Sequence, residues 1–177
     1  MKQIASRTLT VLASLCFAVA LPVTDALAQQ KQKVTYKVSA ANAKYPVRHT
    51  LEIGDEPGHQ VGIFEIHRTF PGDAPVFNGV KLKETWSRGY SDYVNSNGAS
   101  INYTVFVLEN GDKFFTRSTT MGQADAAGKR STISVGHVTG GTGKFVSMKG
   151  LVRSQGASDG KAGFNETQSE IEYWFAK

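Results

Sequence analysis

The first candidates for a chemically active site lie on one predicted strand, Val80–Tyr90. Side chains alternate along a strand. One of the two faces carries Val80, Leu82, Glu84, Trp86, Arg88 and Tyr90, and so includes every large apolar residue of this segment. The other face, from Lys81 to Gly89, has no hydrophobic side chain. The apolar face is therefore predicted to lie inside the domain.

Two charged groups share that predicted interior face, Glu84 and Arg88. Charged groups in an apolar pocket can polarise a bound ligand, so Glu84, Arg88 and Tyr90 are the candidate catalytic residues, and Trp86 is a candidate ligand contact. At about 3.4 Å per residue, Glu84 and Arg88 are roughly 13–14 Å apart and cannot pair with each other. Each would need a partner on another strand if buried. The alternative is that both lie at a solvated rim in ordinary ion pairs.

A second candidate pair is Glu65 and His67, two residues apart on one face of the predicted strand Gln60–Phe70. A carboxylate beside an imidazole can do general acid–base work, although the same pair can form an exposed cross-strand ladder. Both faces of this strand carry apolar and ionisable residues, so alternation alone does not fix its interior side. Tyr103 and Tyr173, on the apolar sides of their own predicted strands, complete the candidate ligand-binding set with Trp86, Glu65 and His67.

Metal and nucleotide chemistry find no support in the sequence. The four histidines, His49, His59, His67 and His137, have no spacing typical of zinc ligands, so no metal and no cofactor are expected. The glycine-rich stretch 140–143 lacks the phosphate-loop pattern, which needs glycine at Val138 and serine or threonine at Phe145. No helical pattern follows it either. We interpret this stretch as a turn between two strands.

Residues 1–28 have the features of an export leader. Lys2 and Arg7 precede an apolar core that is too short to span a bilayer, and a small-residue cleavage pattern ends at Ala28. The only cysteine, Cys16, lies in this leader. We therefore expect a secreted or periplasmic protein with a single domain over residues 29–177, no membrane span and no disulfide. The basic residues are spread along the chain, and the net charge of +5 does not indicate a nucleic-acid partner.

The remainder of the chain reads as short strands separated by turns, with no convincing amphipathic helix. Asn97-Gly98 and Asn110-Gly111 are hairpin signals. The expected strands are 34–40, 47–53, 60–70, 80–90, 101–107, 113–121, 131–138, 145–154 and 165–175. The sequence therefore predicts an all-β domain, a single antiparallel β-barrel of eight or nine strands (calycin-like), because closure removes exposed strand edges.

The turn also carries a resemblance. The segment Val138–Phe145, followed by Gly150 and an apolar strand, resembles the glycine-rich hairpin of the allene oxide cyclase/dirigent superfamily. The resemblance covers about 15 residues and implies an antiparallel barrel that binds an apolar small molecule without a cofactor. It implies that any catalysis is isomerase/cyclase-like or dirigent-like, steering a cyclisation or coupling, and it allows a homo-oligomer, a trimer or a dimer. The alternative is a non-enzymatic envelope or interaction protein whose barrel is filled by its own side chains.

Overall fold

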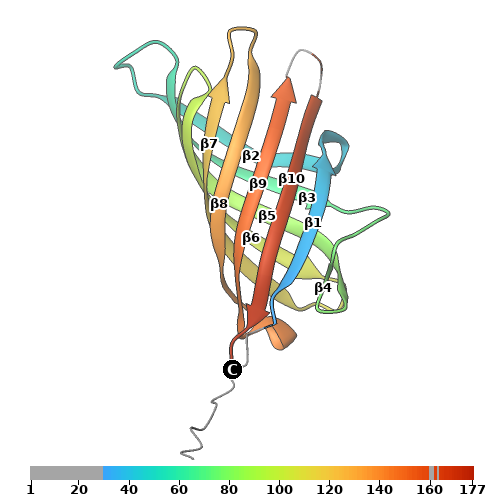
Figure 1. The fold of residues 1–177 in the computed structure, drawn as a ribbon. Helices are drawn as coiled ribbons and strands as arrows, with labels where there is room; N and C mark the ends of the chain where they lie inside the picture. The colour runs from blue at the N-terminus through green and yellow to red at the C-terminus, as the bar shows by residue number, and fades with distance from the viewer. Residues whose placement is uncertain (1–29, 160–161, 163) are drawn as a thin grey trace, which may run out of the picture.

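The computed structural model describes residues 30–159, 162 and 164–177, which form one antiparallel sheet (Figure 1). The predicted leader and its cleavage site at Ala28 lie outside these residues. The strands are β1 (Gln32–Ser39), β2 (Ala43–Glu52), β3 (His59–Thr69), β4 (Val76–Phe77), β5 (Val80–Val94), β6 (Asn97–Leu108), β7 (Lys113–Ala124), β8 (Lys129–Gly141), β9 (Met148–Asp159) and β10 (Phe164–Phe175). Two short 3-10 helices, η1 (Ala40–Asn42) and η2 (Gly143–Phe145), connect strands. The all-β prediction is confirmed, and β4 is the strand that the sequence did not indicate. No helix in the described residues has the length and apolarity to cross a membrane.

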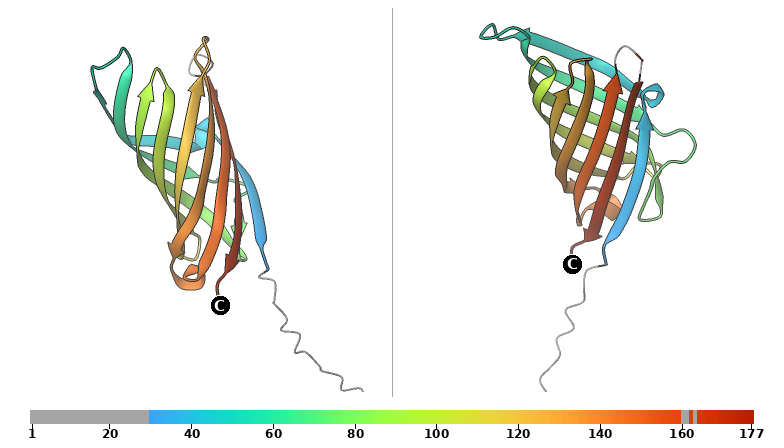
Figure 2. Two further views of the ribbon diagram at one scale, coloured as in Figure 1. Left: turned by 60° about the vertical axis from the view of Figure 1, so that its left-hand side comes forward. Right: turned by 45° about the horizontal axis from the view of Figure 1, so that its top comes forward.

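The sheet curls strongly, but its hydrogen bonding does not close (Figures 1 and 2). The strand order is β1-β10-β9-β8-β7-β6-β5-β3-β2, with β4 paired to β5. Within the described residues no ladder joins β1 to β2, so the expected closed barrel is not confirmed. After η1 the chain turns away, and β2 runs across the sheet instead of beside β1 (Figure 2). Side chains bridge part of this gap, where the ring of Tyr36 meets that of Phe70 edge-on at 5.7 Å.

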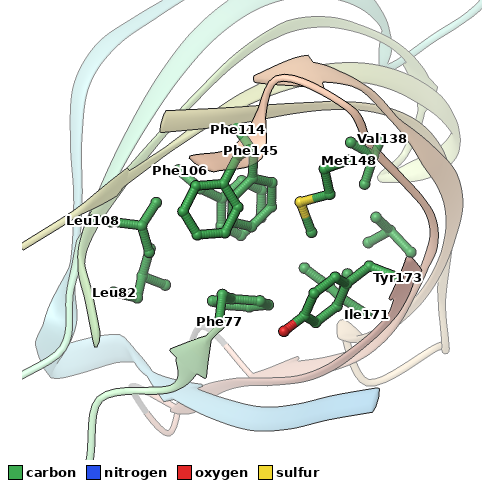
Figure 3. Packing of buried hydrophobic residues seen from close by; sticks show 11 residues of the cluster. Phe77, Leu82, Phe106, Leu108, Phe114, Val138, Phe145, Met148, Ile171 and Tyr173 are labelled. Atoms are coloured by element: carbon green, nitrogen blue, oxygen red, sulfur yellow. The ribbon is translucent and has the colours of Figure 1, made fainter. Parts of the chain in front are cut away.

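An apolar core fills one end of the curled sheet (Figure 3). Phe106 and Phe114 stack at 4.2 Å, and Phe77 from β4 meets Phe114 edge-on at 5.0 Å. Aromatic pairs of this kind add to the free energy gained by burying their surface. The buried cluster comprises Phe77, Leu82, Phe106, Leu108, Phe114, Val138, Phe145, Met148, Val152, Ile171 and Tyr173. This end of the sheet is therefore a packed core.

The glycine-rich segment helps to close that end, although it is not the tight turn expected from the sequence. Gly140 and Gly141 continue β8 and pair with β7, and the chain reverses through η2 before β9. A Cβ at Gly141 would lie 2.5 Å from the carbonyl oxygen of Phe145, so only glycine allows this close approach. The approach places the fully buried Phe145 ring in the core, 5.8 Å from Phe114.

We expect Phe145→Ala to lower the free energy of unfolding by about 3–5 kcal/mol, because it leaves a cavity in a packed aromatic cluster. Chemical denaturation monitored by circular dichroism measures this loss. The neighbouring Val146 is 71% exposed and provides the control, since Val146→Ala should change stability by less than about 0.5 kcal/mol. Equal losses in the two variants would contradict the role given to Phe145.

Candidate functional site

A β-bulge in β5 decides which side chains face the interior. Leu82 is opposite Leu108 on β6, but Glu84 is opposite Val107, so Lys83 is an extra residue in β5. An extra residue reverses the alternation of the side chains that follow it. Leu82 is buried in the core, while beyond the bulge Thr85 and Ser87 are the buried residues. The predicted interior face is therefore correct as far as Leu82 and wrong from Glu84 onward.

Two of the three candidate catalytic residues, Glu84 and Arg88, consequently belong to a ladder on the outer face, across β3 and β5. Glu84 Oε2 lies 2.8 Å from His67 Nε2, and Arg88 Nε lies 2.6 Å from Glu65 Oε2. Between these pairs the His67 and Trp86 rings stack at 4.0 Å, and the Arg88 guanidinium lies 5.6 Å from the Trp86 ring centre. Partial burial raises the pKa of Glu84, but hydrogen bonds from His67 and Trp86 outweigh this effect and lower it. The structure brings these five residues together as an outer cross-strand ladder.

The three remaining candidates are dispersed. Tyr90 and Tyr103 are each half-exposed on the outer face. Tyr173 faces inward but belongs to the apolar core, where its hydroxyl accepts a hydrogen bond from the backbone of Asn78 and donates one to Gln32. The arrangement of Tyr173 is visible in Figure 3. None of the eight predicted site residues lines the interior hollow described below.

The other end of the curled sheet encloses a hollow of about 730 Å³. This volume is in the range of pockets that hold small organic ligands. Sixteen of the 38 residues around the hollow are serine or threonine. The interior of this sheet thus has two parts, an apolar core at the η2 end and a polar hollow beyond it.

A continuous row of hydroxyl groups crosses the wall of the hollow. The strand registers align seven of them from β5 to β1: Ser91, Ser100, Thr120, Ser134, Ser154, Ser169 and Tyr36. Thr120 and Ser134 are hydrogen-bonded at 2.6 Å, and Ser154 and Ser169 at 3.0 Å. Each hydroxyl can donate one hydrogen bond and accept two, so such pairs keep capacity for a ligand.

The charged residues around the hollow are mainly arginines. Arg48, Arg68 and Arg130 line it, whereas Asp159 is the only carboxylate among its described lining residues. In the registers, Arg68 aligns with Thr85 and Phe106, next to the apolar core, whereas Arg130 lies on the strand ends near the hairpin tips. The hollow therefore carries positive charge from its floor to its mouth, which favours a ligand with negative charge.

Arg130 is held by stacking. Its guanidinium lies 4.3 Å from the centre of the Tyr93 ring, a favourable cation–π distance. A Cβ at Gly122 would lie 2.3 Å from Nη2, so the glycine leaves room for the guanidinium. Nε and Nη2 are buried and have no hydrogen-bond partner in the described part of the chain. Because these two nitrogens are covered by protein, they do not face the hollow as ligand donors.

Arg68 interacts electrostatically with Tyr45 and Tyr36, which line the hollow with it. Its Nη1 donates a hydrogen bond to Ser87 Oγ at 3.4 Å, and no described carboxylate forms a salt bridge with it. Burial lowers the pKa of Arg68, although the guanidinium stays protonated at neutral pH. Burial also raises the pKa of Tyr36 to about 12, so Tyr36 is uncharged and does not neutralise Arg68.

Sequence reasoning missed this hollow, although a signal for it was present. Serine and threonine recur at every second position in several strands, as in Thr116-Arg117-Ser118-Thr119-Thr120. Such alternation normally indicates a solvated face. Here it marks the inner face, because an open hollow can be as polar as a surface.

A histidine between two carboxylates lies at the tip of the β2–β3 hairpin. His59 Nδ1 is 2.6 Å from Asp55 Oδ1, and Nε2 is 2.9 Å from Asp92 Oδ1. Hydrogen bonds to Asp92 and Asp55 raise the pKa of His59, and the bond to His59 lowers the pKa of Asp55. Asp55, Glu56 and His59 also form the one group of potential metal ligands in the described residues, but both nitrogens of His59 are already engaged.

Comparison with known proteins found no matching family model, no similar curated protein and no similar solved structure.

The His59 cluster predicts a defined pH dependence of stability. A raised histidine pKa stabilises the fold below the unfolded value, about 6.5, and this contribution is lost as pH rises through the folded pKa. The lowered pKa of Asp55 stabilises the fold above the unfolded value near 3.8, and that contribution is lost as pH falls.

We expect the difference in unfolding free energy between wild type and His59→Gln to be largest near pH 5 and smaller at pH 9. Denaturation curves at both pH values, with His49→Gln as control, measure it. A difference that does not change with pH would contradict the assignment.

Proposed function

We propose that this protein binds a small polyhydroxylated molecule in the hollow of its curled sheet, as an exported binding protein. The observation that carries the proposal is the row of serine and threonine hydroxyls across the inner face of six strands, β5 to β10. Ligand hydroxyls both donate and accept hydrogen bonds, as these side chains do, so the two sets are chemically complementary. The tyrosines on the wall, Tyr36, Tyr45 and Tyr93, add flat surfaces against which a sugar ring can pack.

This ligand class departs from the apolar molecule implied by the family resemblance. An apolar ligand would displace water from the wall hydroxyls without replacing its hydrogen bonds, and each such loss costs about 1–3 kcal/mol. Trp86 and Tyr90, the expected apolar contacts, are on the outer face and give no support to an apolar site. A polar ligand avoids this penalty.

Relation to the allene oxide cyclase/dirigent superfamily is retained as a proposal, supported by Val138–Phe145 and Gly150. The outward position of Glu84, Arg88 and Tyr90 does not favour a cyclisation or coupling carried out by these residues in the hollow. The hollow of about 730 Å³ likewise does not favour the alternative of a structural barrel filled by its own side chains. Export to the periplasm or medium and assembly into a trimer or dimer are further proposals. They are supported by the leader sequence and by the resemblance, respectively.

Native mass spectrometry of protein purified from its own host tests the proposed binding. We expect a retained small molecule that is released on denaturation and is identified as a polyhydroxylated compound. The same spectra give the oligomer mass. Retention of an apolar compound, or of no compound in any preparation, would contradict the proposal.

Replacing hydroxyls of the wall should weaken retention without unfolding the protein. Thr120→Val combined with Ser134→Ala removes both partners of one hydrogen bond, a change that can be nearly neutral for stability. Loss of about two ligand hydrogen bonds should reduce affinity roughly tenfold or more. The matched control is Thr119→Val, one residue away on the outer face, which should retain the molecule as wild type does. Equal retention in the double variant and the control would place the binding site elsewhere.

A further inference from the structure

We infer that the ligand of this hollow is anionic, and that Arg68 at the floor binds its carboxylate or phosphate group. The inference rests on the proposed function and deepens it. It specifies the charge of the ligand and which end of the ligand lies deepest in the hollow. The carrying observation is a guanidinium next to the core that lines the hollow and has no carboxylate partner in the described residues.

Charge balance supports this assignment. Burying a cation without a counter-charge is costly, and proteins normally pair such groups. On the outer face, by comparison, two arginines have carboxylate partners although their side chains are half-exposed: Arg88 pairs with Glu65 and Arg153 with Glu170. Three arginines line the hollow, but Asp159 is the only carboxylate among its described lining residues. Asp159 is the last residue of β9 and lies away from the floor. A ligand oxyanion supplies the charge that the floor lacks.

The surroundings of Arg68 favour an oxyanion over other partners. The guanidinium presents five N–H donors in a planar fork that matches the two oxygens of a carboxylate or phosphate. Nη1 donates to the hydroxyl of Ser87, which is itself hydrogen-bonded to Thr104 at 2.8 Å. Because its pKa is raised, Tyr36 is neutral and does not supply a negative charge to Arg68. Arg130 is the less suitable cation, because two of its nitrogens are covered by protein.

The depth of Arg68 also sets the orientation of the ligand. The register places Arg68 beside Thr85 and Phe106, which border the apolar core. On β5, β6 and β7 the hydroxyl row, at Ser91, Ser100 and Thr120, lies between this floor and the hairpin tips. The anionic group therefore enters first, and the hydroxyl-bearing part is held by the row above it.

Titration calorimetry with three matched sugars tests the inference: D-glucose, D-glucuronate and D-glucose 6-phosphate. We expect one or both acidic sugars to bind wild type at least tenfold more tightly than glucose, because charge-assisted hydrogen bonds are stronger than those between neutral groups. Comparing the affinities of glucuronate and glucose 6-phosphate identifies whether the floor of the hollow prefers a carboxylate or a phosphate. Arg68→Gln should remove this advantage, and Arg68→Lys should retain part of it.

Arg117→Gln is the matched control, since it removes the same charge from the exposed outer face and should leave the acidic preference unchanged. Circular dichroism of each variant verifies folding, and Arg68→Lys keeps the test valid where Arg68→Gln is unstable. Equal affinities for glucose and the acidic sugars would overturn the inference while leaving the proposed function intact. The same holds if native mass spectrometry identifies a neutral polyhydroxylated molecule. Absence of binding by both acidic sugars overturns the inference, and absence of any retained molecule overturns the proposed function as well.

Discussion

One extra residue in β5 determines what this protein presents to its interior. Before the bulge at Lys83, the inward side chain is Leu82, part of the aromatic and aliphatic core. After it, Thr85 and Ser87 face inward, and neighbouring strands continue the same polar rows. A bulge costs a locally disrupted ladder, but here it also allows a single strand to serve a dry core at one end and a hydroxyl-lined wall at the other.

The two halves of the interior depend on each other. The sheet is not closed by hydrogen bonds between β1 and β2 in the described residues, so its curvature needs another source of stability. The packed end supplies it, because β4, η2 and Phe145 fill the space between strands that are distant along the sheet. Since that end is held by apolar burial, the other end can remain open and polar. The stabilising core and the proposed binding hollow are thus separated along the strand direction.

The positions of the strands could be predicted from the sequence, but the face of each strand that points inward could not always be predicted. Alternation and the Asn-Gly turns located each long strand, and the inward faces of β1 and β10 follow the simple apolar pattern. The inward orientation expected for Glu84, Trp86 and Arg88 was wrong because alternation was extended through Lys83, where the bulge has no local signature in the sequence. Barrel closure could not be predicted either, because it depends on how β2 turns after η1. The hydroxyl row was present in the sequence, but only the register of neighbouring strands aligns Thr120 with Ser134.

The two faces of β3 and β5 differ in how their charged side chains are paired. On the outer face, the partly buried Glu84 hydrogen-bonds with His67 and Glu65 pairs with Arg88, so each of these groups already has a partner. On the inner face, Arg68 lies among hydroxyls and neutral aromatic rings, with no described carboxylate in a salt bridge to it. A cation maintained in partial burial without its own counter-ion is stabilised when a ligand provides one. In the proposed complex, binding energy would therefore come from the charge imbalance of the hollow, and Arg68 is the residue at its floor that has no carboxylate partner within the described residues.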